Sequence, residues 1–131
     1  MMKTKALLLG AAIATAVSAC ATTTSPTGRT QYVGAVSQEQ LNQLGEQAFL
    51  QAKSKTPQSR DGRQNAYVGC VVDAIVRQLP PQWRQLRWEE ALFADQETNA
   101  WALPGGKVGV NDGIFKAARN QDQLAAVIAH E

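Results

Sequence analysis

The sequence of 131 residues lacks a strong charge imbalance, a long apolar run and any internal repeat. Its net charge is only +2 and no cluster of lysines and arginines stands out, so nothing favours a nucleic acid as partner. The apolar run at residues 6–17 is shorter than the about 20 residues that cross a membrane as a helix. Low-complexity sequence is confined to one Thr/Ser/Pro/Gly-rich stretch at residues 21–30.

What the N-terminus does contain is a pattern typical of a secretory signal. Lys3 and Lys5 precede the apolar run, which ends in small residues just before Cys20. Residues 17–20, Val-Ser-Ala-Cys, resemble the bacterial lipobox, which implies cleavage before Cys20 and lipidation of that residue. Several acyl chains on one cysteine are enough for stable anchoring. The alternative is an ordinary signal whose cleavage region happens to contain a cysteine.

We therefore expect a signal peptide at 1–19, a lipid-anchored flexible tether at 20–36 and one small domain at 37–131. Ala21, rather than Asp, after the cysteine implies an outer-membrane lipoprotein of the bacterial cell envelope that faces the periplasm. Lipidation of Cys20 would leave Cys70 without an intramolecular disulfide partner. Since Cys70 lies in an apolar helical pattern, we expect it to be buried; a reactive or intermolecular thiol is the alternative.

Capping signals, apolar periodicity and turn residues predict an α+β domain. Ser37 and Gln40 form a capping box, and Pro104-Gly105-Gly106 predicts the turn of a hairpin. The expected helices cover residues 37–53, 61–79, 111–118 and 121–131, and the expected strands cover 86–94, 99–103 and 107–110. The architecture that follows is a group of N-terminal helices, a small antiparallel sheet with a hairpin, and a C-terminal helix.

The final predicted helix is almost wholly apolar from Leu124 to Ala129 and then delivers His130 and Glu131. A helix this apolar is expected to be buried, and a buried imidazole and carboxylate need partners. A metal ion would partner both of them. The alternative is a frayed helix end on which both side chains are exposed to solvent.

Three stretches resemble one gluzincin family of zinc metalloendopeptidases. They are N-A-W-A-L-P-G-G at residues 99–106, the valines and Gly-Ile-Phe at 108–115, and the helix at 122–131 that ends in His-Glu. The family comprises HtpX-like proteases, the CAAX prenyl endopeptidase and periplasmic lipoprotein metalloproteases. Its helix carries H-E-x-x-H, so the resemblance implies a zincin-like domain and a Zn²⁺ cofactor.

Carried over to this sequence, the resemblance makes His130 the first zinc ligand and Glu131 the general base. It makes the strand that contains Asn99, Ala100, Trp101 and Ala102 the edge along which an extended protein or peptide substrate adds. For the side chains of Trp101 and Leu103 we expect hairpin packing. The implied role is the degradation of misfolded periplasmic or outer-membrane proteins.

The sequence departs from the family pattern after Glu131, since the second histidine and the later glutamate ligand are absent from it. A catalytic zinc site takes three protein ligands, and the 131 residues supply one. We therefore expect residues 37–131 to be the N-terminal part of a metalloprotease domain, truncated and inactive alone. The alternatives are a non-catalytic envelope lipoprotein that binds extended strands, as a chaperone or assembly factor, and a structural lipoprotein.

Overall fold

The computed structural model describes residues 21–24, 28–33 and 36–131, and these fall into two compact units, residues 1–37 and 38–131. The predicted signal peptide and the predicted lipidation site, Cys20, lie outside the described residues. No helix in the described part of the chain is both long enough and apolar enough to span a membrane.

The first unit contains a small hairpin inside the segment for which we expected a flexible tether. Strands β1 (Ala21–Thr24) and β2 (Thr30–Val33) pair antiparallel, from Ala21 opposite Val33 to Thr24 opposite Thr30. Threonine is β-branched and favours extended backbone, while Gly28 adopts a φ of +80° that glycine reaches without strain. The composition that predicted a tether therefore also permits local strand pairing.

The second unit begins with two long helices whose boundaries follow the predicted signals closely. Helix α2 (Gln38–Lys55) starts one residue after Ser37 and buries Gly45 and Phe49. Helix α3 (Gly62–Gln78) is capped by Asp61, whose side chain accepts hydrogen bonds from the backbone N–H groups of Arg63 and Gln64. Pro80 follows its end, and a short helix α4 (Pro81–Arg84) comes next.

The prediction that Cys70 is buried is wrong, because its side chain is exposed. Helix α3 buries Val68, Val71 and Val72 instead. Cys70 lies two positions from both Val68 and Val72, which places it about 200° around the helix axis from each of them. The sheet and α5 pack on the side of the helix that carries Val68 and Val72, whereas Cys70 faces solvent.

The sheet has three strands in the order β3-β5-β4, formed by β3 (Glu89–Phe93), β4 (Ala100–Leu103) and β5 (Lys107–Asn111). The predicted hairpin is confirmed, since β4 and β5 pair antiparallel. The sheet is mixed, however, because β3 and β5 pair in parallel. After β3 the chain crosses to the opposite edge of the sheet and forms β4, and β5 then inserts between β3 and β4. Because β5 folds back from β4, it runs in the same direction as β3.

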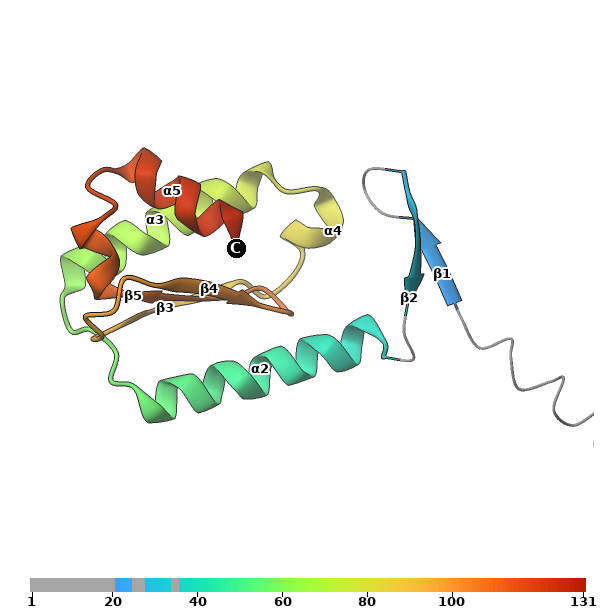
Figure 1. The fold of residues 1–131 in the computed structure, drawn as a ribbon, viewed down its shortest axis with the longest axis horizontal. Coiled ribbons are helices and arrows are strands. Elements are labelled where there is room, and N and C mark those ends of the chain that lie inside the picture. Colours follow the sequence, from blue (N-terminus) through green and yellow to red (C-terminus); the bar gives the residue numbers. More distant parts are fainter. Residues whose placement is uncertain (1–20, 25–27, 34–35) are drawn as a thin grey trace, which may run out of the picture. The chain divides into compact units, whose positions relative to one another are not determined.

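Helices cover both faces of this sheet, with α3 and α5 (Gln121–His130) on one face and α2 on the other (Figure 1). The larger core lies under α3 and α5 and includes Val68, Val72, Leu92, Val110 and Leu124. The smaller core lies against α2 and contains Phe49, Ala91 and Phe93, with Trp101 and Leu103 packed on it. The α+β fold class is therefore as predicted.

Candidate functional site

Helix α5, which carries His130 and Glu131 at its end, is stabilised by an N-terminal cap and by two buried aliphatic side chains. The side chain of Asn120 accepts a hydrogen bond of 2.9 Å from the backbone N–H of Gln123, whose own amide oxygen accepts one of 2.8 Å from Arg119. Leu124 and Ile128 are the buried positions of the helix. They pack into the core with Val68 and Val72 of α3.

His130 and Glu131 are both exposed to solvent. Of the two arrangements considered from the sequence, this chain therefore shows an exposed helix end and not a buried imidazole and carboxylate. Only two positions of the apolar helix are buried, while Ala126 and Ala129 face solvent. The expectation of a buried imidazole is therefore wrong for this chain, because three of the six apolar residues at 124–129 are alanines with little surface to bury. The side chains of His130 and Glu131 form no hydrogen bond or ion pair with another described residue.

The residues that the structure describes do not by themselves form a catalytic zinc site. Within residues 21–24, 28–33 and 36–131, no group of three His, Cys, Asp or Glu side chains lies close enough together to hold a metal ion. His130 is the one histidine of the sequence. A catalytic zinc site requires three protein ligands and an open position for water. His130 therefore supplies one donor without companions among the described side chains.

Strand β4 lies at an open edge of the sheet. The opposite edge, β3, is covered by residues 57–59, because Ser59 N–H donates to Leu92 O and Ala94 N–H donates to Pro57 O, each at 2.8 Å. Among the described residues no strand or loop pairs in this way with the outer side of β4. Asn99–Leu103 is thus the edge that can accept a further strand.

The pairing of β4 with β5 determines which backbone groups point outward. Asn111 N–H donates to Asn99 O at 3.0 Å, so these two residues form a hydrogen-bonded pair. Hydrogen-bonded and non-hydrogen-bonded pairs alternate in an antiparallel ladder, so Ala100 and Ala102, which face Val110 and Val108, are non-hydrogen-bonded. Their N–H and C=O groups are therefore directed away from β5 toward the open edge.

The side chains of β4 are used for packing, as expected for Trp101 and Leu103. The Trp101 ring stacks on Phe93 with a centroid distance of 5.8 Å and meets Phe49 edge-on at 6.0 Å. Ala100 points to the opposite face and is buried in the core under α3 and α5. The strand is held from both faces while its outer backbone stays open.

The turn that joins β4 to β5 depends on its two glycines, as the sequence predicts. Gly105 and Gly106 have φ values of +87° and +79°, a region that other residues rarely adopt. A Cβ on Gly105 would also lie 3.2 Å from the backbone oxygen of Asn42 in α2. The turn is therefore packed closely against α2.

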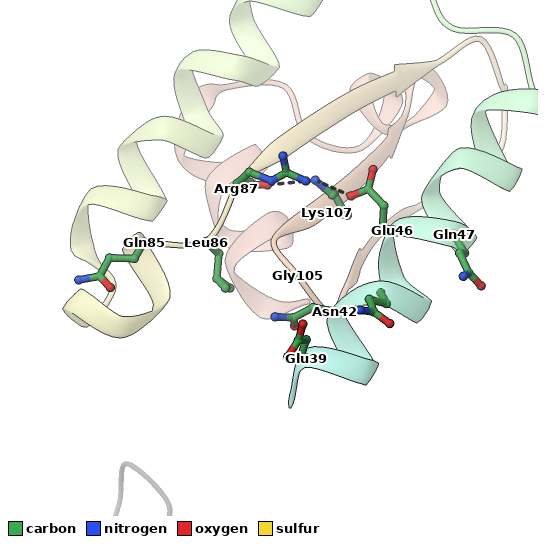
Figure 2. Close-up of a pocket in the computed structure, with 10 residues that line it drawn as sticks. Glu39, Asn42, Glu46, Gln47, Gln85, Leu86, Arg87, Gly105 and Lys107 are labelled. Atoms are coloured by element: carbon green, nitrogen blue, oxygen red, sulfur yellow. Dashed lines mark hydrogen bonds and ion pairs between the residues drawn. The ribbon is translucent and has the colours of Figure 1, made fainter. Parts of the chain in front are cut away.

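A pocket of about 500 Å³ lies beside this turn, between α2 and the segment that precedes β3 (Figure 2). Its innermost charged group is Lys107, which is only 4% exposed. The Lys107 Nζ lies 3.0 Å from Glu46 Oε2 and 3.4 Å from Glu89 Oε2, and it donates to Arg87 O at 3.0 Å. The ammonium group is thus fully engaged, which leaves it no free charge to offer a ligand.

Glu89 also accepts a hydrogen bond of 2.6 Å from Lys53 Nζ. The hydrogen bond from Lys53, reinforced by its charge and by Lys107, holds the pKa of the Glu89 carboxyl below its ordinary value of 4.5, against a smaller opposing effect of burial. Sequence reasoning found no role for Glu89 and missed this network. Lys107 itself could have indicated the network. It lies on the same inward face of its strand as Gly109, and a buried ammonium group requires partners for its charge.

Comparison with known proteins places these elements in a family. Residues 62–131, which run from the start of α3 through Glu131, match the model of peptidase family M48. A 65-residue stretch is 50% identical to the mitochondrial metalloendopeptidase OMA1 of Schizosaccharomyces pombe, covering 50% of this chain and 19% of that protein. The chain thus spans about a fifth of the length of that relative. Since the family match covers more than half of the sequence, the resemblance to zinc metalloproteases is confirmed, and the chain belongs to peptidase family M48.

Proposed function

We propose that this chain contributes to a zinc-dependent metalloendopeptidase that cleaves extended segments of proteins or peptides. The observation that carries the proposal is the packing of α5 against β4. The helix that carries His130 lies against β4, the strand of the three-stranded sheet whose outer backbone groups are open. Both elements fall within the residues that match the M48 peptidases.

The open edge suits a substrate in extended conformation. The outward N–H and C=O groups of Ala100 and Ala102 offer two donors and two acceptors to a peptide that adds as a fourth strand. Such pairing uses backbone groups that every sequence has, so it favours unfolded or misfolded proteins over any one folded substrate. This supports a role in protein quality control.

In the proposed enzyme His130 is a zinc ligand and Glu131 is the general base. M48 peptidases are zinc-dependent, but the described residues supply one ligand and do not fit a catalytic zinc alone. We therefore expect the 131-residue polypeptide to bind no stoichiometric zinc. The family motif predicts a second histidine four positions after His130, so the codons that follow Glu131 in the gene test this directly.

The activity is tested by zinc analysis and casein hydrolysis on the product of the complete reading frame and on the 131-residue chain. We expect zinc and hydrolysis in the former and neither in the latter. In the complete product, Glu131→Gln should abolish hydrolysis but retain zinc, whereas His130→Ala should lose both. Glu90→Gln, on the far strand of the sheet, is the matched control. Hydrolysis that survives Glu131→Gln would contradict the proposal.

We further propose that the protein is a lipoprotein of the bacterial outer membrane that faces the periplasm. Support comes from Lys3 and Lys5, the apolar run and the Val-Ser-Ala-Cys stretch that ends at Cys20. The relative named above is mitochondrial, which describes that protein and not this one. Labelling with radioactive palmitate should mark the wild type but not a Cys20→Ala variant. Equal labelling of both would contradict the proposed anchor.

A non-catalytic strand-binding lipoprotein is the second candidate, favoured by the same open edge of β4. The two functions differ in their dependence on Glu131. A binding protein would suppress aggregation of an unfolded client equally well with Glu131→Gln, and its complete reading frame would show no hydrolysis. A protease would generate cleavage products that disappear with that substitution.

A further inference from the structure

A second pocket, of about 210 Å³, lies beside the start of the open edge strand. It is bounded by the C-terminal part of α2, the loop from β3 to β4, and the first residues of β4. The residues that give it its character are Asp95, Glu97, Asn99, Trp101 and Asn111. A pocket of this size is smaller than most sites for small molecules but suits a single long side chain.

Asn111, at the end of β5, is the polar group of this pocket that lacks a partner. It is only 7% exposed. Its backbone N–H bonds to Asn99 O, but its carboxamide makes no hydrogen bond with any described residue. No completely sealed side-chain nitrogen or oxygen in the described part of the chain is left unpaired, so this carboxamide is open to the pocket. A polar group so deeply buried calls for a ligand.

The two carboxylates of the pocket carry charges that no described cation neutralises. Asp95 Oδ1 accepts a hydrogen bond of 2.9 Å from the backbone N–H of Glu97, but neither side chain has an ion pair with a described residue. The nearby Lys116 directs its ammonium group to the backbone oxygen of Gln96, at 3.0 Å. No lysine or arginine lines the pocket itself. The site is therefore acidic and receptive to a cation.

The register of a peptide added to β4 brings one of its side chains to this pocket. Side chains of laterally paired residues lie on the same sheet face. Trp101 points to the α2 face, and so does Asn99, two positions before it. The peptide residue opposite Asn99 would direct its side chain to the same face, beside the pocket and the Trp101 ring.

We infer that this pocket is a subsite for a lysine or arginine side chain of an extended peptide bound along β4. Asp95 and Glu97 would form charge-assisted hydrogen bonds with the ammonium or guanidinium group, and the Asn111 carboxamide oxygen would accept another. A metal ion fits less well, because the described residues contain no cluster of three His, Cys, Asp or Glu side chains. The inference rests on the proposed substrate edge.

The test measures binding of capped, fluorescein-labelled seven-residue peptides to the 131-residue chain by fluorescence anisotropy. The peptides are identical except at the central residue, which is lysine, arginine, norleucine or glutamate. We expect the lysine and arginine peptides to bind about 10-fold more tightly than the norleucine peptide, and the glutamate peptide to bind most weakly. High salt should reduce the preference for lysine and arginine.

The variants separate the subsite from the edge. Asp95→Asn with Glu97→Gln should remove the preference for lysine and leave binding of the norleucine peptide unchanged. Glu39→Gln with Asp73→Asn is the control. It changes the net charge by the same amount at sites distant from the pocket and should preserve the preference for lysine. Ala102→Pro removes one outward N–H without removing a hydrogen bond to β5, and it should weaken the binding of all four peptides.

Each outcome bears on one of the two proposals. Equal affinity for the lysine and norleucine peptides, with both weakened by Ala102→Pro, would overturn the subsite and leave the edge intact. Binding that Ala102→Pro does not change would overturn the substrate edge, as would no binding of any peptide, and the subsite would fall with it. Loss of the lysine preference in the distant control pair would show that net charge alone produced it.

Discussion

The indole ring of Trp101 on β4 occupies the space above Gly109, its cross-strand partner on β5. A Cβ added to Gly109 would overlap the ring. The ring is held from its other side by Phe93 and at its edge by Phe49. The position of the open edge strand therefore depends on a residue in the neighbouring strand that has no side chain.

Gly109→Ala is expected to destabilise the domain by about 1–3 kcal/mol, because the added methyl group must displace the Trp101 ring from a packed site. Urea denaturation measures the change. Gly62→Ala is the control, since nothing lies within 4 Å of a Cβ at Gly62, which is the first residue of α3. Equal stability of the two variants would contradict the steric account. Trp101→Ala should relieve most of the cost of Gly109→Ala.

The ion pairs of Glu89 predict a pH dependence of stability. Its pKa is lowered in the folded protein, chiefly by the hydrogen bond from Lys53, so the carboxylate stabilises the fold fully above its ordinary pKa of 4.5. This contribution is lost as the pH falls through the lowered pKa. The wild type should be more stable than Glu89→Gln at pH 7, and the difference should shrink below pH 4.5.

Urea denaturation of both proteins across this pH range measures the effect. Because the Glu89 side chain is 43% exposed, solvent screening limits it to about 1 kcal/mol. Glu39→Gln, on the exposed start of α2, is a matched control that should give no such trend. If the difference in free energy of unfolding between wild type and Glu89→Gln were constant with pH, it would arise from packing and not from charge.

The cap of α5 predicts a loss of order in the helix that carries His130. Asn120→Ala removes the acceptor for the Gln123 N–H and should cost about 0.5–2 kcal/mol. Asn120→Asp keeps the acceptor and should restore most of the stability. Amide hydrogen exchange resolves the effect, with faster exchange expected along α5 than along α3. Uniform acceleration in both helices would mean that α5 does not open on its own.

The exposure of Cys70 predicts a thiol that is accessible in the folded protein. In a Cys20→Ser background, Ellman's reagent should modify one thiol per chain without denaturant, and Cys70→Ser should abolish the reaction. A buried thiol would react only at the rate of unfolding. Observation of that slow rate would restore the interpretation drawn from the sequence.

Much of the local structure could be predicted because its causes are local. Asp61 and Asn120 cap their helices with their own side chains, and Gly105 and Gly106 supply the backbone angles of the turn. Helix boundaries and the hairpin follow from such residues within a few positions of each other. These are the features for which prediction and structure agree best.

The features that prediction missed depend on contacts between distant parts of the chain. Both Val68 and Cys70 of helix α3 are apolar, so the packing of the helix against the sheet and α5 decides that Val68 is buried and Cys70 exposed. The parallel pairing of β3 depends on where β5 inserts, which turn chemistry does not specify. The partners of Lys107 come from α2 and β3, elements that no spacing in the sequence relates to it.

The central position of β5 has a consequence for biosynthesis. Each outer strand of this sheet has β5 as its strand neighbour, and β5 is the last of the three to leave the ribosome. Until residues 107–111 emerge, β3 can pair only with residues 57–59, and Ala91, Leu92 and Phe93 have no complete sheet in which to be buried. While β4 and the turn are being synthesised, the nascent chain therefore exposes an apolar, aggregation-prone strand. A pause in translation there would prolong the time during which it needs a chaperone.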